Sequence, residues 1–538
     1  MQRWHIILIL ILVGTALYAP TMNNPLFWDD DDWIVNNPAV HELSWSHAKF
    51  LFSHDVLAGV GARSNYYRPV LMLSFAINWA LGGRTPWGYH LVSNGLHIAN
   101  AVLIFLLLDA LLKNRRQAAL AALLWLVHPL QTEAIAYIAG RGDPLSVFFM
   151  LSAILLWLRT DRFRYWALPC AVLATLSRET AVLLPGYMVV VLLASLYRAE
   201  PLSRAFGKAL KATWPFVAIA ATYTLLRLTI LDFQNTLNWY QYANVYTEHI
   251  TVRTWTFLQA LWTYLRLTIV PLDLHMERTI PVLTTPWYWS VAGGSALLLS
   301  LAALIWRDSL RGRRLWFFGA AMFLLPLVPS SGIIAPINAL IYEHWLYLSL
   351  LGFAAIVAVY GIRLYDWLYV RRRALAYLVC ALGVAYVGFF NVQTVRRTIL
   401  WGSPEQFYLQ IISYVPDNAR VLNNLANIYA ARGDEKATEY YLRRAMEADP
   451  SQPAPYHNLG NLIRDRGRDQ EAAGLYRQAI SVDPLFHYAY RNLAALLLSH
   501  GDTAGALKIV AALRERIPQD TGVQTLYEQV RQYMPQKK

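Results

Sequence analysis

Four consecutive carboxylates, Asp29 to Asp32, are the side chains of this sequence best placed to do chemistry. They lie between Trp28 and Trp33, shortly after an apolar run from Ile6 to Tyr18 that could enter a bilayer. An ionised aspartate at the centre of a bilayer costs about 2.5–3.5 kcal/mol, so water must reach this cluster. Crowded like charges raise one another's pKa and could tune a base, or the oxygens could bind a divalent cation. The sequence keeps both chemistries open.

Other cations and carboxylates interrupt the apolar sequence at several separated points. An inert membrane anchor would not need charged groups from so many segments at one level of the bilayer, so we expect them to form a site. These polar segments are Tyr67 to Pro69, His128 to Glu133, Gly140 to Pro144, Ser177 to Thr180, His275 to Arg278, and Tyr342 to His344.

Composition indicates the kind of protein that must position these groups. The chain has 538 residues, of which 56% are hydrophobic, with a mean hydropathy of +0.32. Its 20 Trp and 32 Tyr suit the aromatic belts of bilayer interfaces, which predicts a polytopic membrane protein. The net charge of +13 could suggest nucleic acid, but the cations lie in short loops between apolar segments, where membrane orientation explains them. Cys170 and Cys380 lie within apolar segments, so no disulfide framework or cysteine zinc site is expected.

The apolar segments predict about eleven membrane spans. We expect the first, Ile6 to Tyr18, to remain as an uncleaved span, because no small-residue cleavage site precedes the acidic cluster. Two further apolar helices, Tyr67 to Leu81 and Thr254 to Val270, are ambiguous, and we expect both to be interfacial. The other ten spans are expected near 89–112, 117–138, 143–158, 165–177, 179–197, 212–231, 287–306, 315–331, 342–362 and 374–392.

Loop charge predicts which side the acidic cluster faces. The basic loops near 113–116, 159–164, 198–211, 307–314 and 363–373 share one side, whereas the opposite short loops hold only Arg141 and Arg178. The positive-inside rule therefore places the basic loops in the cytoplasm and the first loop, residues 23–88, outside. An odd number of spans also places the C-terminal region outside. We expect a prokaryotic plasma membrane with a periplasmic site, or an endoplasmic reticulum with a lumenal one.

Beyond residue 400 the sequence becomes periodic. Pro416, Pro450, Pro484 and Pro518 follow one another at 34 residues, the tetratricopeptide period. We expect three helical repeats at 419–452, 453–486 and 487–520, a capping helix at 521–533, and a half-repeat from Pro404 to Pro416. The predicted fold is therefore all-α: a helical membrane domain, residues 1–400, followed by a repeat solenoid, residues 401–538.

Asparagines recur on the first helix of each repeat. Side-chain amides spaced in this way could hold the backbone of an extended peptide in the solenoid groove. They could equally be solvated or contact neighbouring helices, and the sequence does not decide between these readings. The asparagines that we consider for acceptor binding are Asn424, Asn427, Asn458, Asn461 and Asn492, with Asn423 beside them.

The order and spacing of the membrane-half motifs resemble the transmembrane and tetratricopeptide-repeat (TMTC-like) O-mannosyltransferases. More widely they resemble the GT-C glycosyltransferases, which use polyprenyl-phosphate sugars and carry an acidic motif in the first external loop. The segments that carry the resemblance are Phe27 to Asp30 with Ile34 and Asn37, Tyr67 to Pro69, Tyr89 to Leu91, His128-Pro129 with Thr132 to Ala134, Gly140-Arg141, and Glu343 with Leu346-Tyr347.

The resemblance implies an integral membrane enzyme that moves a sugar, typically mannose, from a lipid phosphate to a protein hydroxyl. A Ser or Thr hydroxyl is a poor nucleophile, so Asp29 or Asp30 would act as the base, with inversion at the anomeric carbon. The leaving lipid phosphate needs charge stabilisation, for which Arg141, Arg178 and Arg278 are candidates together with His344. Alternatively, these arginines pair with Asp143, Glu179 and Glu277 or extend to the membrane surface. We expect metal-free chemistry, with a divalent cation on Asp29 to Asp32 as the alternative.

One position departs from the family pattern. The family usually has Glu-Arg before the Leu-Tyr pair, whereas this chain has Glu343-His344. A histidine binds phosphate less firmly because it is only partly charged at neutral pH. His128 could be a ligand or a base, but a lone histidine at a span end is more often a structural hydrogen-bonder. The residues that we expect to support the site are Tyr67, Arg68, His128, Glu133, Glu179 and Glu343.

Two other function classes stay open on the sequence. A lipid-linked sugar transporter could use the same external cations but would not require paired aspartates. A membrane scaffold that recruits proteins through the repeats would tolerate Asn at both positions. The partners that we expect are a polyprenyl-phosphate sugar, a protein or peptide acceptor and the bilayer, with no nucleic acid. No sequence motif identifies the sugar.

Overall fold

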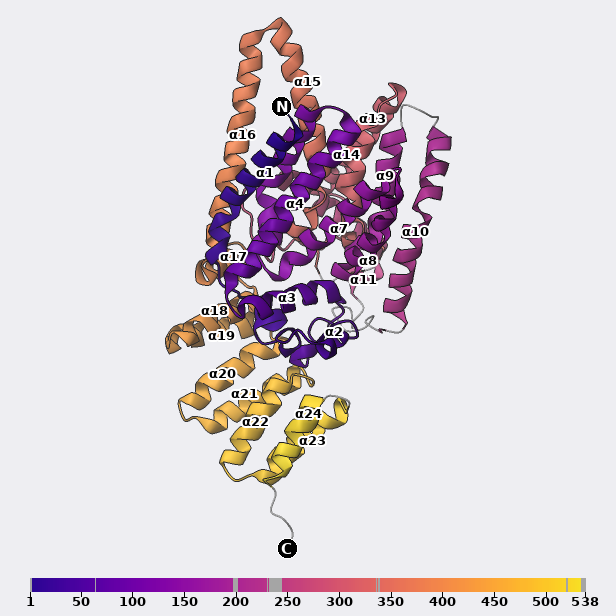
Figure 1. Ribbon diagram of the computed structural model, residues 1–538. Coiled ribbons are helices and arrows are strands. Elements are labelled where there is room, and N and C mark those ends of the chain that lie inside the picture. The colour runs from indigo at the N-terminus through magenta and orange to yellow at the C-terminus, as the bar shows by residue number, and fades with distance from the viewer. Residues whose placement is uncertain are drawn as a thin grey trace. The chain divides into compact units, whose positions relative to one another are not determined.

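The computed structural model describes residues 2–62, 64–196, 202–229, 231, 244–334, 336, 339–518 and 521–533. The chain divides into two compact units, Met1–Ser403 and Pro404–Lys538 (Figure 1). Within the described residues every regular element is helical, which confirms the predicted all-α class. The predicted basic loop 198–211, the predicted spans 179–197 and 212–231, and the third predicted repeat lie partly outside the described residues.

Seven helical segments of the first unit are long and apolar enough to cross a bilayer. A bent pair, α5 (Arg115–Val127) followed by η5 (Pro129–Gln131) and α6 (Thr132–Ala136), adds an eighth, with a 53° bend at the break before Pro129. Proline cannot continue the hydrogen bonding of a helix, which explains the bend. The seven are α1 (Arg3–Tyr18) with η1 (Ala19–Asn23), α4 (Pro86–Leu112), η6 (Ala139–Arg141) with α7 (Gly142–Trp157), α10 (Leu202–Leu228), α13 (Trp289–Leu310), α15 (Leu350–Arg371) and α16 (Arg373–Leu400).

The remaining three predicted spans fall on shorter helices. A helix rises 1.5 Å per residue and a bilayer core is about 30 Å thick, so these helices span it only where the bilayer is thinner. The predicted total of eleven spans, and the orientation that follows from it, remain predictions. The three are η7 (Arg162–Trp166) with α8 (Ala167–Ser177), η8 (Glu179–Leu183) with α9 (Leu184–Leu196), and α14 (Leu315–Leu324) with η9 (Leu325–Leu327).

Helix α3 (Pro69–Gly82) corresponds to the expected juxtamembrane helix. Its 14 residues extend only about 21 Å, and it runs crosswise to the long helices (Figure 1). The neighbouring loops contain α2 (Trp45–Leu51), α11 (Val245–Glu248) and α12 (Ile250–Ile269). Short helical turns complete this unit: η2 (Asp31–Val35), η3 (Pro38–Val40), η4 (Ala58–Val60), η10 (Pro329–Ser331) and η11 (Glu343–Leu346).

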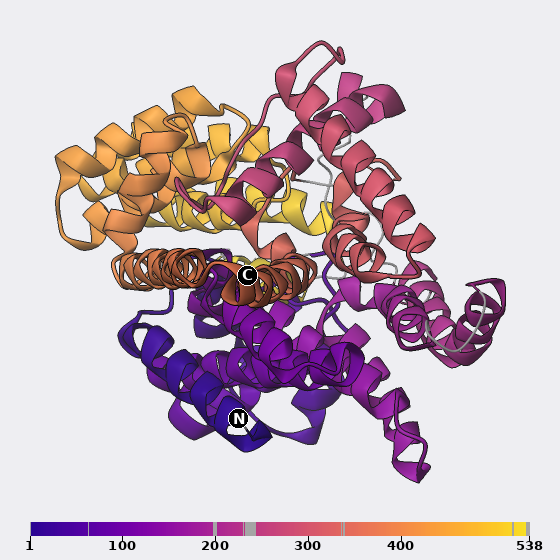
Figure 2. The same ribbon diagram turned by 90° about the horizontal axis from the view of Figure 1, so that it is seen from above.

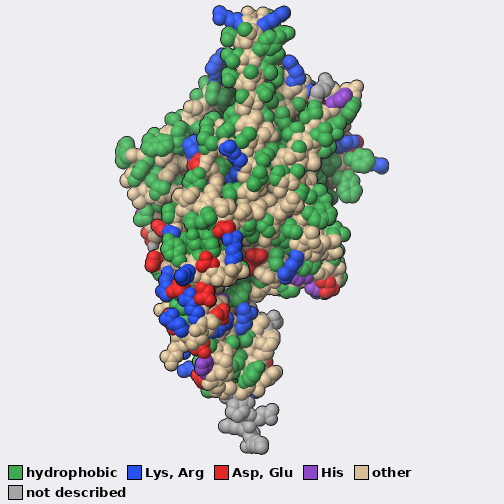
Figure 3. Space-filling model, turned by 90° about the vertical axis from the view of Figure 1, so that its left-hand side faces the viewer, with side chains coloured by type: hydrophobic (Ala, Val, Ile, Leu, Met, Phe, Trp, Pro, Cys, Tyr) green, Lys and Arg blue, Asp and Glu red, His purple; other side chains and the backbone are tan. Residues whose placement is uncertain are grey.

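Helix α15 packs against helices from both the early and the late part of the first unit. It packs against α5 on one side and α14 on the other, so the α15–α16 hairpin stands between them when viewed along the helices (Figure 2). Gly319 of α14 and Gly352 of α15 make this approach possible, because a Cβ on Gly352 would lie 2.1 Å from the Gly319 carbonyl oxygen. In Figure 3 a broad belt of the helical surface carries few charges, and arginines gather at the hairpin tip.

The second unit consists of paired helices with the predicted period. Gly433, Gly467 and Gly501, 34 residues apart, turn the chain between paired helices with φ of +74°, +74° and +77°, a conformation that favours glycine. After α17 (Pro404–Tyr414), the pairs are α18 (Ala419–Ala431) with α19 (Glu435–Ala448), α20 (Pro453–Asp465) with α21 (Asp469–Val482), and α22 (His487–Ser499) with α23 (Thr503–Arg516), followed by α24 (Thr521–Arg531).

Candidate functional site

The four aspartates of the acidic cluster have different surroundings. Asp31 and Asp32 are exposed, Asp29 is half-buried, and Asp30 is only 2% exposed. Trp28, which precedes them, has φ of +67°, a strained value for a bulky residue that re-aims the chain at this point. The cluster is therefore not one equivalent set of ligands.

Asp30 is held by backbone groups. Its two carboxylate oxygens accept hydrogen bonds from the amides of Ala139 (2.7 Å) and Phe27 (3.3 Å). Burial outweighs these bonds and raises the pKa of Asp30 to about 8. Asp30 thus ties the first loop to the start of η6 and holds its proton up to neutral pH.

Asp29 accepts a hydrogen bond from the hydroxyl of Tyr137 at 2.5 Å. Tyr137 stacks on Trp401, with ring centroids 5.6 Å apart, and Trp401 also contacts Phe27. The Asn24 side chain donates to the Thr398 carbonyl, so the end of α16 lies beside the acidic cluster. Asp29 therefore combines a fixed orientation with partial exposure.

Arg141 is fully buried and bonded to neutral groups. Its guanidinium donates to Ser93 Oγ, Ser74 Oγ, Asn78 Oδ1 and the Tyr89 carbonyl at 2.7–3.2 Å. In the described part of the chain no carboxylate is bonded to it. These contacts tie the start of α7 to α3 and α4, which leaves few donors for a phosphate.

Arg178 and His344 line one small cavity of about 60 Å³, room for a few water molecules. Arg178 donates to Asp143 at 2.7 Å, and His344 Nδ1 lies 2.5 Å from Glu133 Oε1. The wall is otherwise mainly apolar, including Val147, Met150, Leu183, Pro326, Pro329, Trp345 and Leu348. Two of the predicted phosphate-binding residues are thus brought together at one small, mainly apolar cavity.

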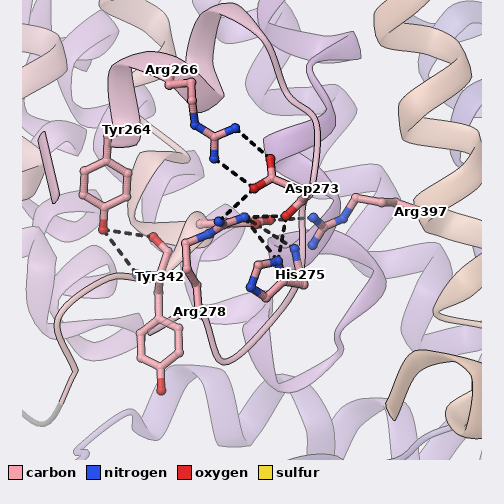
Figure 4. Close-up of polar contacts among 8 residues, drawn as sticks. Tyr264, Arg266, Asp273, His275, Arg278, Tyr342 and Arg397 are labelled. Carbon is pink, nitrogen blue, oxygen red and sulfur yellow. Dashed lines mark hydrogen bonds and ion pairs between the residues drawn. The ribbon is translucent and has the colours of Figure 1, made fainter. Parts of the chain in front are cut away.

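Arg278 lies in a different cluster. It contacts Asp273, at 3.2 Å, and Glu343, at 3.5 Å, while Arg397 reaches Glu343 from α16 at 2.6 Å (Figure 4). Arg266 binds Asp273 through both guanidinium nitrogens. A second cavity, of about 370 Å³, is lined by Arg266 and Arg278 with Trp262, Tyr288 and Trp289. Three arginines here face two carboxylates.

Electrostatics in this cluster oppose the effect of burial on Asp273 and add to it on His275. Burial favours a neutral Asp273, but the hydrogen bond from Arg266 and the charge of Arg278 lower its pKa. Burial and then Arg278 lower the pKa of His275 to about 4, so this imidazole is neutral at physiological pH. The cluster therefore holds its positive charge on the arginines.

Glu179 accepts hydrogen bonds from the Tyr67–Arg68 segment. It accepts from the Tyr67 amide at 3.1 Å and from Arg68 Nε at 2.9 Å, with Arg227 3.9 Å away. The alternative reading paired the candidate arginines with carboxylates near them in sequence. In the structure Arg178 pairs with Asp143, and Arg278 pairs with Asp273 and Glu343, while Glu179 pairs with Arg68.

His128 has the contacts of a structural residue. Its Nδ1 accepts from the Leu130 amide and its Nε2 lies 2.9 Å from the Thr268 carbonyl oxygen, at the bend between α5 and η5. Its ring packs on Phe390. This arrangement agrees with the structural reading of a lone histidine at a span end.

The structure describes all four aspartates of the acidic cluster, and brings no group of three or more His, Cys, Asp or Glu into metal-binding distance within the described residues. Both oxygens of Asp30 already accept backbone hydrogen bonds. The residues do not form a cation cage here, so we derive no step through a metal.

The repeat asparagines form a ladder between neighbouring repeats. Asn458 donates to Asn423 and Asn427, at 2.9 and 3.1 Å, and Asn492 donates to Asn461 at 2.7 Å. Asn492 also lies 2.9 Å from the Nε2 of His457. Contact with neighbouring helices, one of the two readings open from the sequence, is thus observed for these residues. It uses both amide donors of Asn458 and of Asn492.

Sequence reasoning missed Tyr137, Trp401, Asp273 and Arg397. Tyr137 follows Glu133 by four residues and precedes Arg141 by four, so its place between two polar motifs was the available signal. Trp401 and Arg397 lie at the end of an apolar run, and Asp273 in a loop after Pro271. Their roles depend on contacts across the fold that no local pattern encodes.

Comparisons with known proteins agree with this architecture. A family model described as tetratricopeptide repeat matches residues 464–530. The chain is 25% identical to the mouse protein O-mannosyl-transferase TMTC2 over 81% of its own length and 61% of that relative. It is 25% identical to the Caenorhabditis elegans protein O-mannosyl-transferase F38B6.6, covering 83% of the chain and 63% of the relative, and 25% identical to human TMTC3, covering 81% and 51%.

The resemblance predicted from the membrane-half motifs is thereby confirmed: the chain is similar to TMTC proteins along about four-fifths of its length. It spans about three-fifths of the length of the first of these relatives.

Proposed function

We propose that this protein is a membrane O-glycosyltransferase that moves mannose or another hexose from a polyprenyl phosphate to Ser or Thr hydroxyls of a polypeptide. The observation that carries the proposal is the difference in burial and contacts between two neighbouring residues of the acidic cluster. Asp29 is half-buried and oriented by Tyr137, whereas Asp30 is buried and bound by two backbone amides. The names of the relatives, which are protein O-mannosyl-transferases, support the same reaction class.

In the proposed reaction Asp29 is the base. It accepts the proton of the acceptor hydroxyl as the oxygen attacks the anomeric carbon and the bond from sugar to phosphate breaks. The displacement is direct, so the anomeric configuration inverts and no sugar–enzyme adduct forms. Asp30 is a positioning residue, because its backbone bonds fix the loop that presents Asp29.

The donor phosphate is assigned to the cavity that Arg178 and His344 line. Its apolar walls suit a lipid chain, and Arg178 provides a permanent cation. Arg141, whose donors are used by Ser93, Asn78 and the Tyr89 carbonyl, is assigned to positioning α3 and α4 instead of phosphate binding. Arg278 stays a candidate for a more distant part of the donor, through the second cavity.

The repeat unit is proposed to hold the polypeptide acceptor. The ladder occupies the donors of Asn458 and Asn492 but leaves the amide donors of Asn427 and Asn461 for a peptide carbonyl. Asn424, half-buried on the same helix as Asn427, is a further candidate. Within the first unit, the end of α16 lies beside Asn24, close to the acidic cluster.

The test is transfer by the full chain in lipid nanodiscs, with a labelled polyprenyl-phosphate mannose and a Ser/Thr peptide. We expect Asp29→Asn to lower transfer by about 10²–10⁴-fold, the usual contribution of a general base. Asp32→Asn, a change at an exposed position of the same cluster, is the matched control and should retain most activity. Undiminished transfer by folded Asp29→Asn would reject the base assignment, and absence of transfer in every variant would favour the transporter or scaffold alternative.

A further inference from the structure

His344 has one ring nitrogen committed to a buried carboxylate. Glu133, only 1% exposed, faces its Nδ1, and within the described residues the other oxygen of Glu133, Oε2, has no hydrogen-bond partner. A carboxylate so placed holds the imidazole in one orientation and stabilises its protonated form. No arginine is bonded to Glu133 in the part of the chain that is described.

The other nitrogen of His344 is available to a ligand in the cavity that Arg178 and His344 line. His344 lines that cavity, and its Nε2 has no hydrogen-bond partner among the described residues. The permanent cation of the same cavity, Arg178, is already matched by Asp143 at 2.7 Å. Any further positive charge that this cavity offers to a ligand therefore depends on protonation of His344.

The proposed reaction creates a charge at this place. A polyprenyl-phosphate sugar is a phosphodiester with one negative charge. When the bond from the anomeric carbon to the phosphate oxygen breaks, its electron pair stays on that oxygen and adds a second negative charge. A group that presents a proton there stabilises the transition state more than the bound donor, which is the requirement for catalysis.

We propose that His344, oriented by Glu133, is the proton-bearing ligand of the leaving phosphate; this inference rests on the proposed function. The protonated imidazole donates from Nε2 to the departing oxygen, while the hydroxyl proton of the acceptor passes to Asp29. If the imidazole proton transfers fully, the products are the glycosylated peptide and polyprenyl hydrogen phosphate. Water then returns a proton to His344 and takes one from Asp29, so the cycle closes without net change in the enzyme.

Transfer should therefore depend on pH through His344, in addition to Asp30, whose pKa of about 8 lies in the same range. His344 interacts electrostatically with Glu133 and with Asp143, and Arg178 and Arg397 also act on Glu133. Tyr342 stacks on the ring at 5.2 Å, and deprotonation in this setting leaves the new phosphate charge without a donor. The titratable and charged groups around His344 are Glu133 from α6, Asp143 from α7, Arg178 before η8, Tyr187 from α9, Tyr342 and Glu343 beside it, and Arg397 from α16.

The experiment measures single-turnover transfer and binding of labelled polyprenyl phosphate from about pH 5.5 to 9, with the full chain in nanodiscs. We expect wild-type transfer to fall by about tenfold per pH unit on the alkaline side, as for one essential proton. His344→Arg carries a permanent cation, so both the alkaline fall in transfer and that in binding should disappear. His344→Gln should bind and transfer weakly at all pH values, and His54→Arg, an exposed histidine, should keep the wild-type profile.

A second variant keeps the proposal falsifiable if His344→Arg does not fold. Glu133→Gln removes the counter-charge of the imidazole, so the alkaline fall should move to lower pH by about one unit or more. An alkaline fall unchanged in His344→Arg, or unmoved in Glu133→Gln, overturns the proposal. If the wild type transfers nothing, the proposed function fails, and the pH dependence of polyprenyl-phosphate binding in wild type and His344→Arg still decides the role of His344.

Discussion

The two units of this chain place their charged side chains in opposite ways. In the first unit carboxylates such as Glu133, Glu343 and Asp143 are nearly inaccessible and pair with basic side chains from distant segments. In the repeat unit ion pairs such as Arg466–Glu439 lie at the surface, and neutral amides join the repeats. A buried pair is costly to break, because the remaining charge has no water, whereas a surface pair contributes little. Buried charge pairs therefore hold segments of the first unit together, whereas the charge pairs of the repeat unit contribute little to its stability.

The largest expected effect is the loss of a buried cation. Arg397→Met should destabilise the first unit by about 3–5 kcal/mol, because it strips Glu343 of its 2.6 Å partner. Arg466→Met, which removes a cation from two surface pairs of the repeats, is the matched control and should cost at most about 1 kcal/mol. Unfolding of each variant in detergent measures the difference.

A double variant sharpens this result. Arg397→Met combined with Glu343→Leu removes both charges and should recover much of the lost stability. Equal losses in the single and double variants would show that packing, and not charge, accounts for the effect, and the contrast between the units would then fail.

An intermediate effect is expected in the repeats, where packing replaces charge. A Cβ on Gly460 would lie 2.7 Å from the ring of Tyr476, so Gly460→Ala should cost about 1–3 kcal/mol through overpacking. Gly474→Ala, in α21, meets nothing within 4 Å and should be neutral or slightly stabilising. Hydrogen exchange of α20 and α21 in the full chain distinguishes the two; similar protection in both variants would contradict the close contact.

Per pH unit, the smallest effect is the dependence of stability on pH. The pKa of Asp30 is raised to about 8 in the folded chain, so the fold binds a proton that the unfolded chain releases near pH 4. Its contribution is complete below about pH 4 and is lost as pH rises toward 8, by at most about 1.4 kcal/mol per unit. Melting temperatures at pH 5 and pH 8 should differ less in Asp30→Asn than in wild type, and an unchanged difference would contradict the buried acid.

The difference between the units also explains what the sequence could predict. The repeats follow from local period, so their helices and the glycine turns at Gly433, Gly467 and Gly501 could be placed from spacing alone. In the first unit apolar runs predict long helices, and the motifs identify Asp29, Asp30, Arg178 and His344 as candidates. Their partners could not be predicted, because Arg68 and Glu179, or Glu133 and His344, meet only after the chain has folded across many residues.

The acidic cluster shows the same limit in one short segment. Asp29 to Asp32 are identical in type and adjacent in sequence, yet the contacts with Ala139 and Tyr137 give Asp30 and Asp29 different surroundings. Those contacts come from residues more than a hundred positions away, so spacing and composition cannot assign them.

The shared glycine turn of the repeats has a consequence for how such a chain can diversify. Because each of the three copies turns between its paired helices through the same left-handed glycine, another 34-residue copy could be added with the same internal backbone geometry. The number of repeats can therefore change by whole copies without any change in the residues of the first unit.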